Sequence, residues 1–290
     1  MSDDNSTLLR CSVCKQLLPK TRFTPKAKVR KNGTMRDPVR ISIARLCYQA
    51  TEHPAVGEWL ARTATAILAD SRHVVGLNSF WVDRSPVYCA RNYAVEIAKQ
   101  QRADFLVMID HDMLPDYIPN ASAFWDTSFA FAMQHDGPCM IGAPCARADG
   151  SVCVFREVET DDTIGLEFWD QEFAATATGI EKVPAVSLAL SLIDMRCFEA
   201  VKKPYFQFGF ADEALTTVSW GEESFGVKLT EAGVPVFVNW DCWAGHSKTI
   251  IHGKPVAKHG GLWLNDPELN DERDERIERE SESCRRREEE

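Results

Sequence analysis

Two patterns of hydrophobic residues alternate along the chain from residue 39 onward. Short apolar runs are typical of strands buried in a parallel sheet, and they are separated by segments with helical periodicity. The runs that we expect to form strands are 39–47, 73–77, 105–109, 139–145, 184–194 and 234–240. The segments that we expect to form helices are 58–69, 86–101, 121–134, 195–201 and 219–232. This alternation predicts an α/β fold with a mostly parallel sheet flanked by helices.

The two ends of the chain differ in charge from the segment between them. Residues 9–40 contain ten Lys or Arg and one acid, whereas residues 41–265 contain 17 bases and 28 acids. We therefore expect a basic arm at 1–38, a main domain at 39–265 and a charged tail at 266–290. The tail has six Arg, twelve acids and almost no apolar residues, a composition that predicts disorder.

The basic arm contains a Cys-x-x-Cys pair, Cys11 and Cys14. A zinc site normally needs four ligands, commonly two such pairs, and the second pair is missing. A zinc ion at Cys11 and Cys14 and a flexible basic arm with two unligated thiols are therefore alternatives.

Composition narrows the class of protein. With 290 residues the chain is long enough for a substantial core, and no apolar run of about eighteen residues predicts a membrane span. The amino-terminal residues lack the pattern of a signal peptide, and the ten cysteines form no disulfide framework. We expect reduced thiols and a cytoplasmic location, in the host cytoplasm if the protein is viral. The usual glycine-rich nucleotide motifs are missing, which argues against a P-loop NTPase or an ordinary dinucleotide-binding protein.

The strongest chemical signal is a pair of carboxylates, Asp110 and Asp112, directly after the apolar run 105–109. In extended chain both side chains point the same way, and two neighbouring carboxylates repel each other. A divalent cation, Mg²⁺ or Mn²⁺, would relieve that repulsion and take its remaining ligands from water and phosphates. The alternative is a solvated loop that merely contains acids.

Four short segments together resemble the GT-A-fold glycosyltransferases, especially those like glycosyltransferase family 2, including phage and bacterial members. They are Ala90–Asn92, Ile109–Asp112, Gly221–Glu223 and Ala244–His246, in this order. The resemblance covers about residues 40–250. It implies a GT-A fold and the metal-dependent transfer of a sugar from a nucleotide-sugar donor to an acceptor hydroxyl.

The resemblance assigns the metal to three residues. Asp110 and Asp112 fall on the Asp-x-Asp motif that holds Mn²⁺ or Mg²⁺ on the donor diphosphate, and His246 falls on a further metal ligand. Because imidazole is a less usual ligand for Mg²⁺, a histidine ligand favours Mn²⁺. The metal is expected to act as a Lewis acid on the departing nucleotide diphosphate.

The pair Glu222 and Glu223 matches the Glu-Asp pair of inverting members, in which the second acid deprotonates the acceptor. Glu223 is therefore the expected general base, with Glu222 as the alternative and with Asp212 and Glu213 in reserve. Acids in the first turn of a helix are also favourable without any catalytic role, because they complement the helix dipole.

The donor side of the resemblance involves Arg91, Asn92 and Ser187. Arg91 suits phosphate oxygens, and Asn92 follows it in the same motif. Ser187 and Ala189 take the places of two glycines near the donor sugar. Four aromatic residues just before the Glu pair form either an acceptor platform or part of the core; they are Tyr205, Phe206, Phe208 and Phe210.

Two other functions remain open at this stage. A sugar-phosphate nucleotidyltransferase would need a glycine-rich basic loop after the first strand, and none follows residue 45. A nucleic-acid-binding or nucleic-acid-modifying protein could use the basic arm to dock on phosphates. The sequence does not identify the donor sugar, the oligomeric state or the acceptor, which could be a glycan, a protein, a nucleic acid or a small molecule.

Overall fold

The structure is a computed structural model. It describes residues 8–11, 17–19, 37–47, 52–70, 72–84, 86–117, 123–147, 150–159, 164–207, 209–210, 218–220, 223–247, 251–252, 256–258 and 261–263. Several sequence-based expectations lie outside these residues, namely those for Cys14, Phe208, Asp212, Glu213, Glu222 and the tail at 266–290. For Cys11, Phe210 and Glu223 only the backbone is described.

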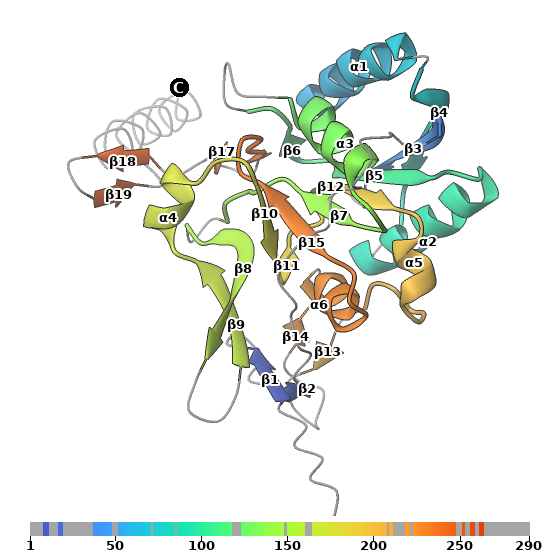
Figure 1. Ribbon diagram of the computed structural model, residues 1–290. Coiled ribbons are helices and arrows are strands. Elements are labelled where there is room, and N and C mark those ends of the chain that lie inside the picture. The colour runs from blue at the N-terminus through green and yellow to red at the C-terminus, as the bar shows by residue number, and fades with distance from the viewer. Residues whose placement is uncertain are drawn as a thin grey trace, which may run out of the picture.

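A seven-stranded sheet forms the centre of the molecule (Figure 1). In spatial order its strands are β10 (Ile180–Val183), β15 (Val236–Asn239), β7 (Met140–Gly142), β12 (Leu190–Asp194), β5 (Phe105–Asp110), β3 (Val39–Leu46) and β4 (Val74–Val82). Five of them run in one direction, while β10 and β12 run antiparallel to their neighbours. The expected α/β class with a mostly parallel sheet is confirmed.

Helices cover both faces of this sheet (Figure 1). Helices α1 (Pro54–Ala69) and α3 (Phe124–Gln134) pack into one hydrophobic cluster. Helices α2 (Val87–Gln100), α5 (Cys197–Ala200) and α6 (Glu223–Glu231) pack into the other. All six residues of β5 are buried between these layers, as its unbroken apolar run predicts. Within the described residues, no helix is both long enough and apolar enough to cross a membrane.

Several element boundaries differ from the sequence-based expectation. Helix α1 begins at Pro54, four residues earlier than expected, because His53 caps it: the His53 Nδ1 accepts a hydrogen bond from Ala55 N at 3.2 Å. Strand β4 continues to Val82 because it pairs with β3 along its whole length. The expected helix at 219–232 begins only at Glu223, after strand β14 (Val218–Trp220).

The expected strand at 184–194 is also divided. Residues 185–186 form β11 (Ala185–Val186), which pairs with β8 (Val152–Glu159) outside the central sheet. Residues 190–194 form β12 inside it. The chain therefore changes sheets at 187–189, and this break lies next to the carboxyl end of β5, where Asp110 N donates to Ala189 O at 2.9 Å.

Strands β11 and β8 belong to a second sheet, which has five strands. Strands β8 and β9 (Ile164–Trp169) form an antiparallel hairpin, followed by α4 (Gln171–Thr176). The backbone of β1 (Leu8–Cys11) pairs with β9, and β2 (Leu17–Pro19) pairs with β1. Part of the segment expected to be a separate arm thus extends this second sheet.

The remaining described strands are short. Strand β16 (Gly245–Ser247) lies between β6 (Met113–Leu114) and β17 (Ile251–His252). Two further ribbons pair β13 (Gly209–Phe210) with β14, and β18 (Val256–Lys258) with β19 (Gly261–Trp263).

Candidate functional site

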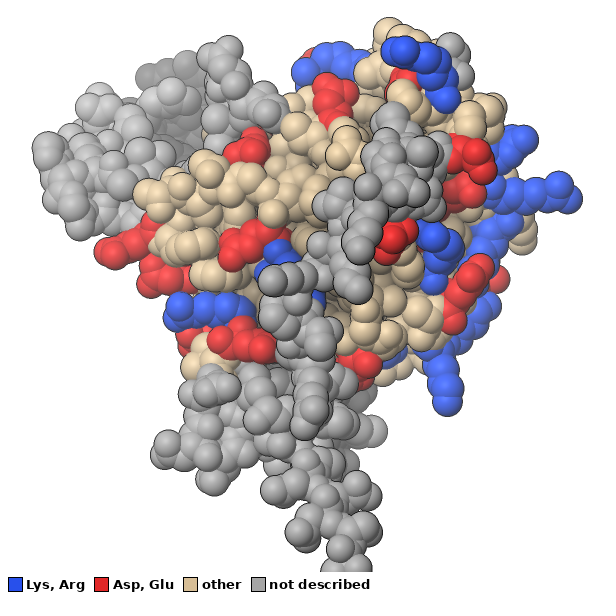
Figure 2. All heavy atoms as spheres, viewed as in Figure 1, with Lys and Arg blue, Asp and Glu red and all other residues tan. Residues whose placement is uncertain are grey.

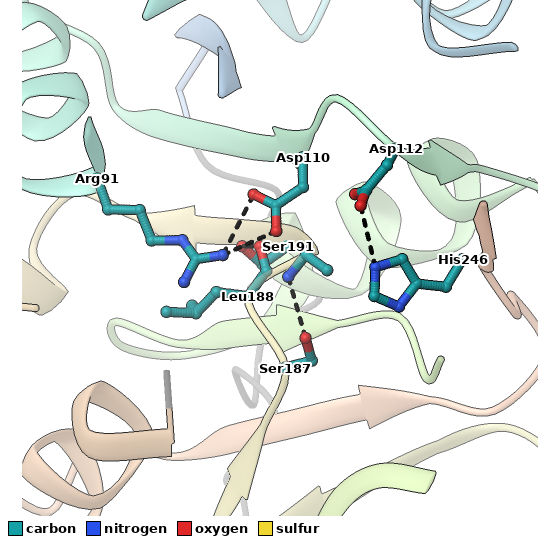
Figure 3. Close-up of polar contacts among 8 residues, drawn as sticks. Arg91, Asp110, Asp112, Ser187, Leu188, Ser191 and His246 are labelled. Atoms are coloured by element: carbon teal, nitrogen blue, oxygen red, sulfur yellow. Dashed lines mark hydrogen bonds and ion pairs between the residues drawn. The ribbon is translucent and has the colours of Figure 1, made fainter. Parts of the chain in front are cut away.

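The candidate site lies at the carboxyl end of β5, in the middle of the central sheet (Figure 3). The strand ends at Asp110, and residues 111–112 form a turn that leads into β6. The turn is held against the neighbouring strand, because His111 N donates to Leu46 O at 3.0 Å. The ends of strands in open α/β sheets are the usual place for ligand sites.

Asp110 forms a buried ion pair with Arg91 from helix α2 (Figure 3). The Arg91 Nη2 lies 2.9 Å from one carboxylate oxygen of Asp110 and 3.2 Å from the other. The exposed fraction is 1% for Arg91 and 5% for Asp110. Because both charges are removed from water, each depends on the other for compensation.

Asp112 pairs instead with His246, which is 134 positions later in the chain (Figure 3). The pairing of β6 with β16 brings the two together, since His246 lies opposite Met113 and Ser247 N donates to Asp112 O at 2.7 Å. The His246 Nε2 is then 3.3 Å from the Asp112 Oδ2. Asp112 is 9% exposed, and the His246 side chain is 23% exposed.

The two aspartates therefore have different partners. We expected them to point the same way because the chain would be extended through Asp112, but the strand ends at Asp110 and a turn follows. The guanidinium of Arg91 contacts Asp110, and the imidazole of His246 contacts Asp112.

A carboxylate oxygen and an imidazole nitrogen, side by side at Asp112 and His246, are a suitable pair of ligands for Mn²⁺. Within the described part of the chain, no group of three or more His, Cys, Asp or Glu side chains could hold a metal ion. A cation held by Asp112 and His246 would have these two protein ligands and would need water and a bound phosphate for the others.

Asn92 has a structural task. Its Nδ2 donates to Tyr88 O at 2.8 Å and to Phe206 O at 2.7 Å. Its Oδ1 accepts from Tyr205 N at 3.1 Å and from Phe206 N at 3.3 Å. Both amide hydrogens and both lone pairs of the Asn92 side chain are used in these bonds. Asn92 therefore holds the 205–206 segment against α2, and its side chain has no further hydrogen bond to offer a nucleotide-sugar.

Ser187 lies in the break between β11 and β12, on the side of Asp110 (Figure 3). Its hydroxyl accepts a hydrogen bond from Ala189 N at 3.2 Å, and Ser187 N donates to Cys153 O at 2.9 Å. The turn packs closely against Gly142 at the end of β7, because a Cβ at Gly142 would lie 2.6 Å from Val186 and 3.0 Å from Ser187 O. The backbone of Ala189 is thus bonded to Asp110, while the Ser187 hydroxyl is bonded within its own turn.

The expected acids and aromatic residues are only partly described. Glu223 is the first residue of α6, and its side chain lies outside the described atoms. Tyr205 and Phe206 are buried in the hydrophobic core with Phe198 and Phe225, and the Phe206 and Phe225 rings are 4.7 Å apart. For these two aromatic residues, core packing is the observed role.

Sequence analysis missed one polar group at this end of the sheet. Arg45 lies near the end of β3, opposite Ile109, and its Nη1 is 3.2 Å from Glu52 Oε1. Its guanidinium also lies 5.0 Å from the ring centre of Trp81. An arginine near the end of an apolar strand is the only signal in the sequence, and it does not reveal the partner.

Comparisons with known proteins leave the function open. No protein-family model matches the chain, and no curated protein matches it. A solved structure titled "Crystal Structure of A197 from STIV" is 15% identical to this chain, with a TM-score of 0.47. The match covers 78% of this chain and 94% of that one. A likeness this distant assigns no function, so the functional argument rests on the site itself.

Proposed function

We propose that this protein is a metal-dependent glycosyltransferase that moves a sugar from a nucleotide-sugar donor to an acceptor hydroxyl with inversion. The observation that carries the proposal is the convergence of two pairs at the end of β5, Arg91 with Asp110 and Asp112 with His246. This convergence joins three of the four segments on which the resemblance to GT-A enzymes rests.

The Arg91–Asp110 pair suits the recognition of a diphosphate. A guanidinium binds phosphate oxygens through directed hydrogen bonds, and burial strengthens these bonds. Both carboxylate oxygens of Asp110 accept from the Nη2 of Arg91, which fixes the orientation of the guanidinium. Asp110 is then a positioning residue for Arg91.

Asp112 and His246 would hold the divalent cation. When bound there, Mn²⁺ or Mg²⁺ supplies positive charge beside the diphosphate as it leaves. The two metal ligands that we propose are thus Asp112 and His246, whereas Asp110 contributes through Arg91. This division of work differs from the expectation that both aspartates ligate the metal.

For the acceptor side, the proposal rests on the resemblance. Glu223, at the start of α6, is the proposed general base, with Glu222 as the alternative. A single in-line displacement requires a carboxylate within hydrogen-bond reach of the acceptor hydroxyl. The direct test of inversion is the anomeric configuration of the product.

The experiment is a panel of UDP-, GDP-, CMP- and TDP-sugars, each with and without Mn²⁺. A ligand that binds only the folded protein raises its melting temperature by mass action. We expect one donor class to stabilise the protein in a metal-dependent way and to release free nucleotide slowly.

Two aspartate variants decide whether the stabilisation comes from the proposed site. We expect Asp112→Asn to remove the metal-dependent stabilisation and to slow nucleotide release about 100-fold. Asp70→Asn is the matched control, because it breaks another Asp–His pair, in which His73 Nδ1 lies 2.7 Å from Asp70 Oδ1. Full metal-stimulated activity in Asp112→Asn would sink the proposal.

A further inference from the structure

Two cysteines, Cys145 and Cys153, lie in a short antiparallel hairpin beside the candidate site. An antiparallel bridge joins Ala146 to Val152. One of the hydrogen bonds next to this bridge runs from Cys153 N to Cys145 O at 2.8 Å. In an antiparallel pair, the residues that flank a bridge also lie opposite each other. Cys145 and Cys153 are therefore cross-strand neighbours.

The packing of the hairpin places both thiols on the same side. Cys145 is 2% exposed and belongs to the hydrophobic cluster that contains α1 and α3, and the half-buried Cys153 packs against that cluster. The chain neighbours of Cys153, Val152 and Val154, belong to the other cluster. Side chains alternate along a strand in this way, so both thiols point into one layer.

The expected spacing of the two cysteines suits a disulfide. Opposed residues of an antiparallel pair have Cα atoms about 4.5–5.5 Å apart, within the range of about 4.4–6.8 Å found for disulfides. Their Cβ atoms are about 4.5–5.5 Å apart and need to approach by about 1 Å. Only the seven residues 146–152 lie between the two cysteines, so the covalent loop would be short.

The two thiols differ in access from solvent. Cys153 is half-buried and Cys145 is buried, so a soluble oxidant reaches Cys153 first. Figure 2 shows acidic and basic side chains close together over the region where Figure 1 places β8 and β9. Arg156 and Glu167, one on each of these strands, form an ion pair. Because neither sign dominates, a small charged disulfide meets no strong repulsion there.

We propose that Cys145 and Cys153 form a reversible disulfide, and that the oxidant is a small-molecule disulfide such as oxidised glutathione. The thiolate of Cys153 attacks one sulfur of oxidised glutathione and releases the first glutathione. The thiolate of Cys145 then attacks Cys153 Sγ and releases the second. Two electrons pass from the cysteines to glutathione, and the two thiol protons go to the departing glutathione thiolates.

Cys153 is connected to the Asp110 part of the candidate site. Its carbonyl oxygen accepts a hydrogen bond from Ser187 N at 2.9 Å, where the chain breaks between β11 and β12. Two residues later, Ala189 O accepts from Asp110 N at 2.9 Å. A restraint on Cys153 therefore acts on the segment that bonds to Asp110.

Cys145 is connected to the His246 part of the same site. The carbonyl oxygen of the preceding residue, Pro144, accepts from Ala244 N at 3.0 Å, two residues before His246. A disulfide from Cys145 to Cys153 would thus restrain both segments that adjoin the site. This connection follows from backbone hydrogen bonds and does not depend on the proposed glycosyltransferase function.

Peptide mapping tests the disulfide directly. We would equilibrate the native protein with mixtures of reduced and oxidised glutathione, block the remaining thiols with N-ethylmaleimide and digest with trypsin without reduction. Cleavage after Arg147 separates the two cysteines, so the disulfide joins peptide 103–147 to peptide 148–156. We expect mass spectrometry to detect this linked pair. Its absence at every glutathione ratio overturns the proposal.

Single variants identify the sulfur atoms. Cys145→Ser and Cys153→Ser should each abolish the linked pair, and Cys145→Ser should trap glutathione on Cys153, the product of the first step. Cys139→Ser is the matched control, because it removes the other cysteine of peptide 103–147 and should leave the linked pair intact. A disulfide between Cys139 and Cys153 would overturn the assignment.

The unfolded chain shows whether the fold builds this pair. We expect the equilibrium constant for disulfide formation to be about tenfold higher in the native protein than in 8 M urea, because the hairpin raises the effective concentration of the two thiols. By linkage, oxidation should raise the folding equilibrium constant by the same factor. An equal or lower constant in the native protein overturns the proposal.

Hydrogen exchange tests the connection to the site. Oxidation should slow exchange at the amides of Ser187 and Ala244 about threefold, because the disulfide restrains the acceptors of both. The fast amides of β4 serve as the internal control and should not change. Unchanged exchange at Ser187 and Ala244 overturns the connection. A protein that forms the disulfide and binds no nucleotide-sugar refutes only the glycosyltransferase proposal.

Discussion

At the scale of single residues, the Arg91–Asp110 ion pair is distinguished by its burial. Both partners are almost fully buried, so each charge has lost its hydration and depends on the other. The same chemistry on the surface costs little to break, because water replaces the lost partner. The contribution of the pair to stability therefore depends on its burial more than on the identity of the two residues.

Arg91→Leu should therefore lower the free energy of unfolding by about 3 kcal/mol or more, since it removes the buried guanidinium that faces the Asp110 carboxylate. Lys203→Ala breaks a mostly exposed pair with Glu96, and it should leave stability unchanged within experimental error. Urea unfolding measures both. Equal, small effects would mean that water reaches Asp110.

The buried thiol of Cys242 leads to a prediction about how stability depends on pH. Burial raises the pKa of its thiol from 9.0 to about 12. The folded protein then keeps a proton that the unfolded chain releases above pH 9, so stability falls as the pH rises from about 9 toward 12. The loss approaches about 1.4 kcal/mol per pH unit for one proton. Urea unfolding at pH 8 to 10 should show a shallower decline for Cys242→Ala than for the unaltered protein.

At the scale of elements, close packing of helices on the sheets positions the candidate site. Helix α6 approaches β11 closely because Gly226 has no side chain: a Cβ there would lie 2.8 Å from Ala185 Cβ and 2.9 Å from Ala185 Cα. Helix α1 contains a glycine, Gly57, with free space around the position of a Cβ. A Cβ at Gly57 would have Glu52 Oε1, at 3.8 Å, as its nearest neighbour.

These two glycines should respond oppositely to the same change. Gly57→Ala should stabilise the protein by up to about 1 kcal/mol, because alanine has the higher helix propensity. Gly226→Ala should destabilise it by about 1–3 kcal/mol, because the contact with backbone and Cβ atoms forces α6 away from β11. Denaturant unfolding of both variants tests the pair, and a stabilising Gly226→Ala would contradict the packing described.

At the scale of the whole molecule, stability should follow the order of strands in the central sheet. Strand β5 lies between β3 and β12, with all six of its residues buried. Strand β4 is the last strand of this sheet in the described structure, and it bonds to β3 on one side. Backbone groups with a partner on one side open with less cost than those in the centre.

Native-state hydrogen exchange should therefore rank the amides of β5 and β12 as the slowest in the central sheet. Alternate amides along β4, those that do not face β3, should exchange fastest among its strands. Peptide-resolved mass spectrometry measures this ranking. Slow exchange along all of β4 would show that another chain covers this edge in solution.

The sequence by itself determined the class of fold, because hydrophobic periodicity is a local property. Strand β5 and helix α2 lie where the sequence pattern placed them. Only the tertiary structure decided which partner each polar side chain has. Arg91 and Asp110 are 19 positions apart, Asp112 and His246 are 134 apart, and Asn92 bonds to a segment more than 110 positions away. Such pairings depend on strand register and helix packing, which involve contacts between distant segments and leave no periodic signal in the chain.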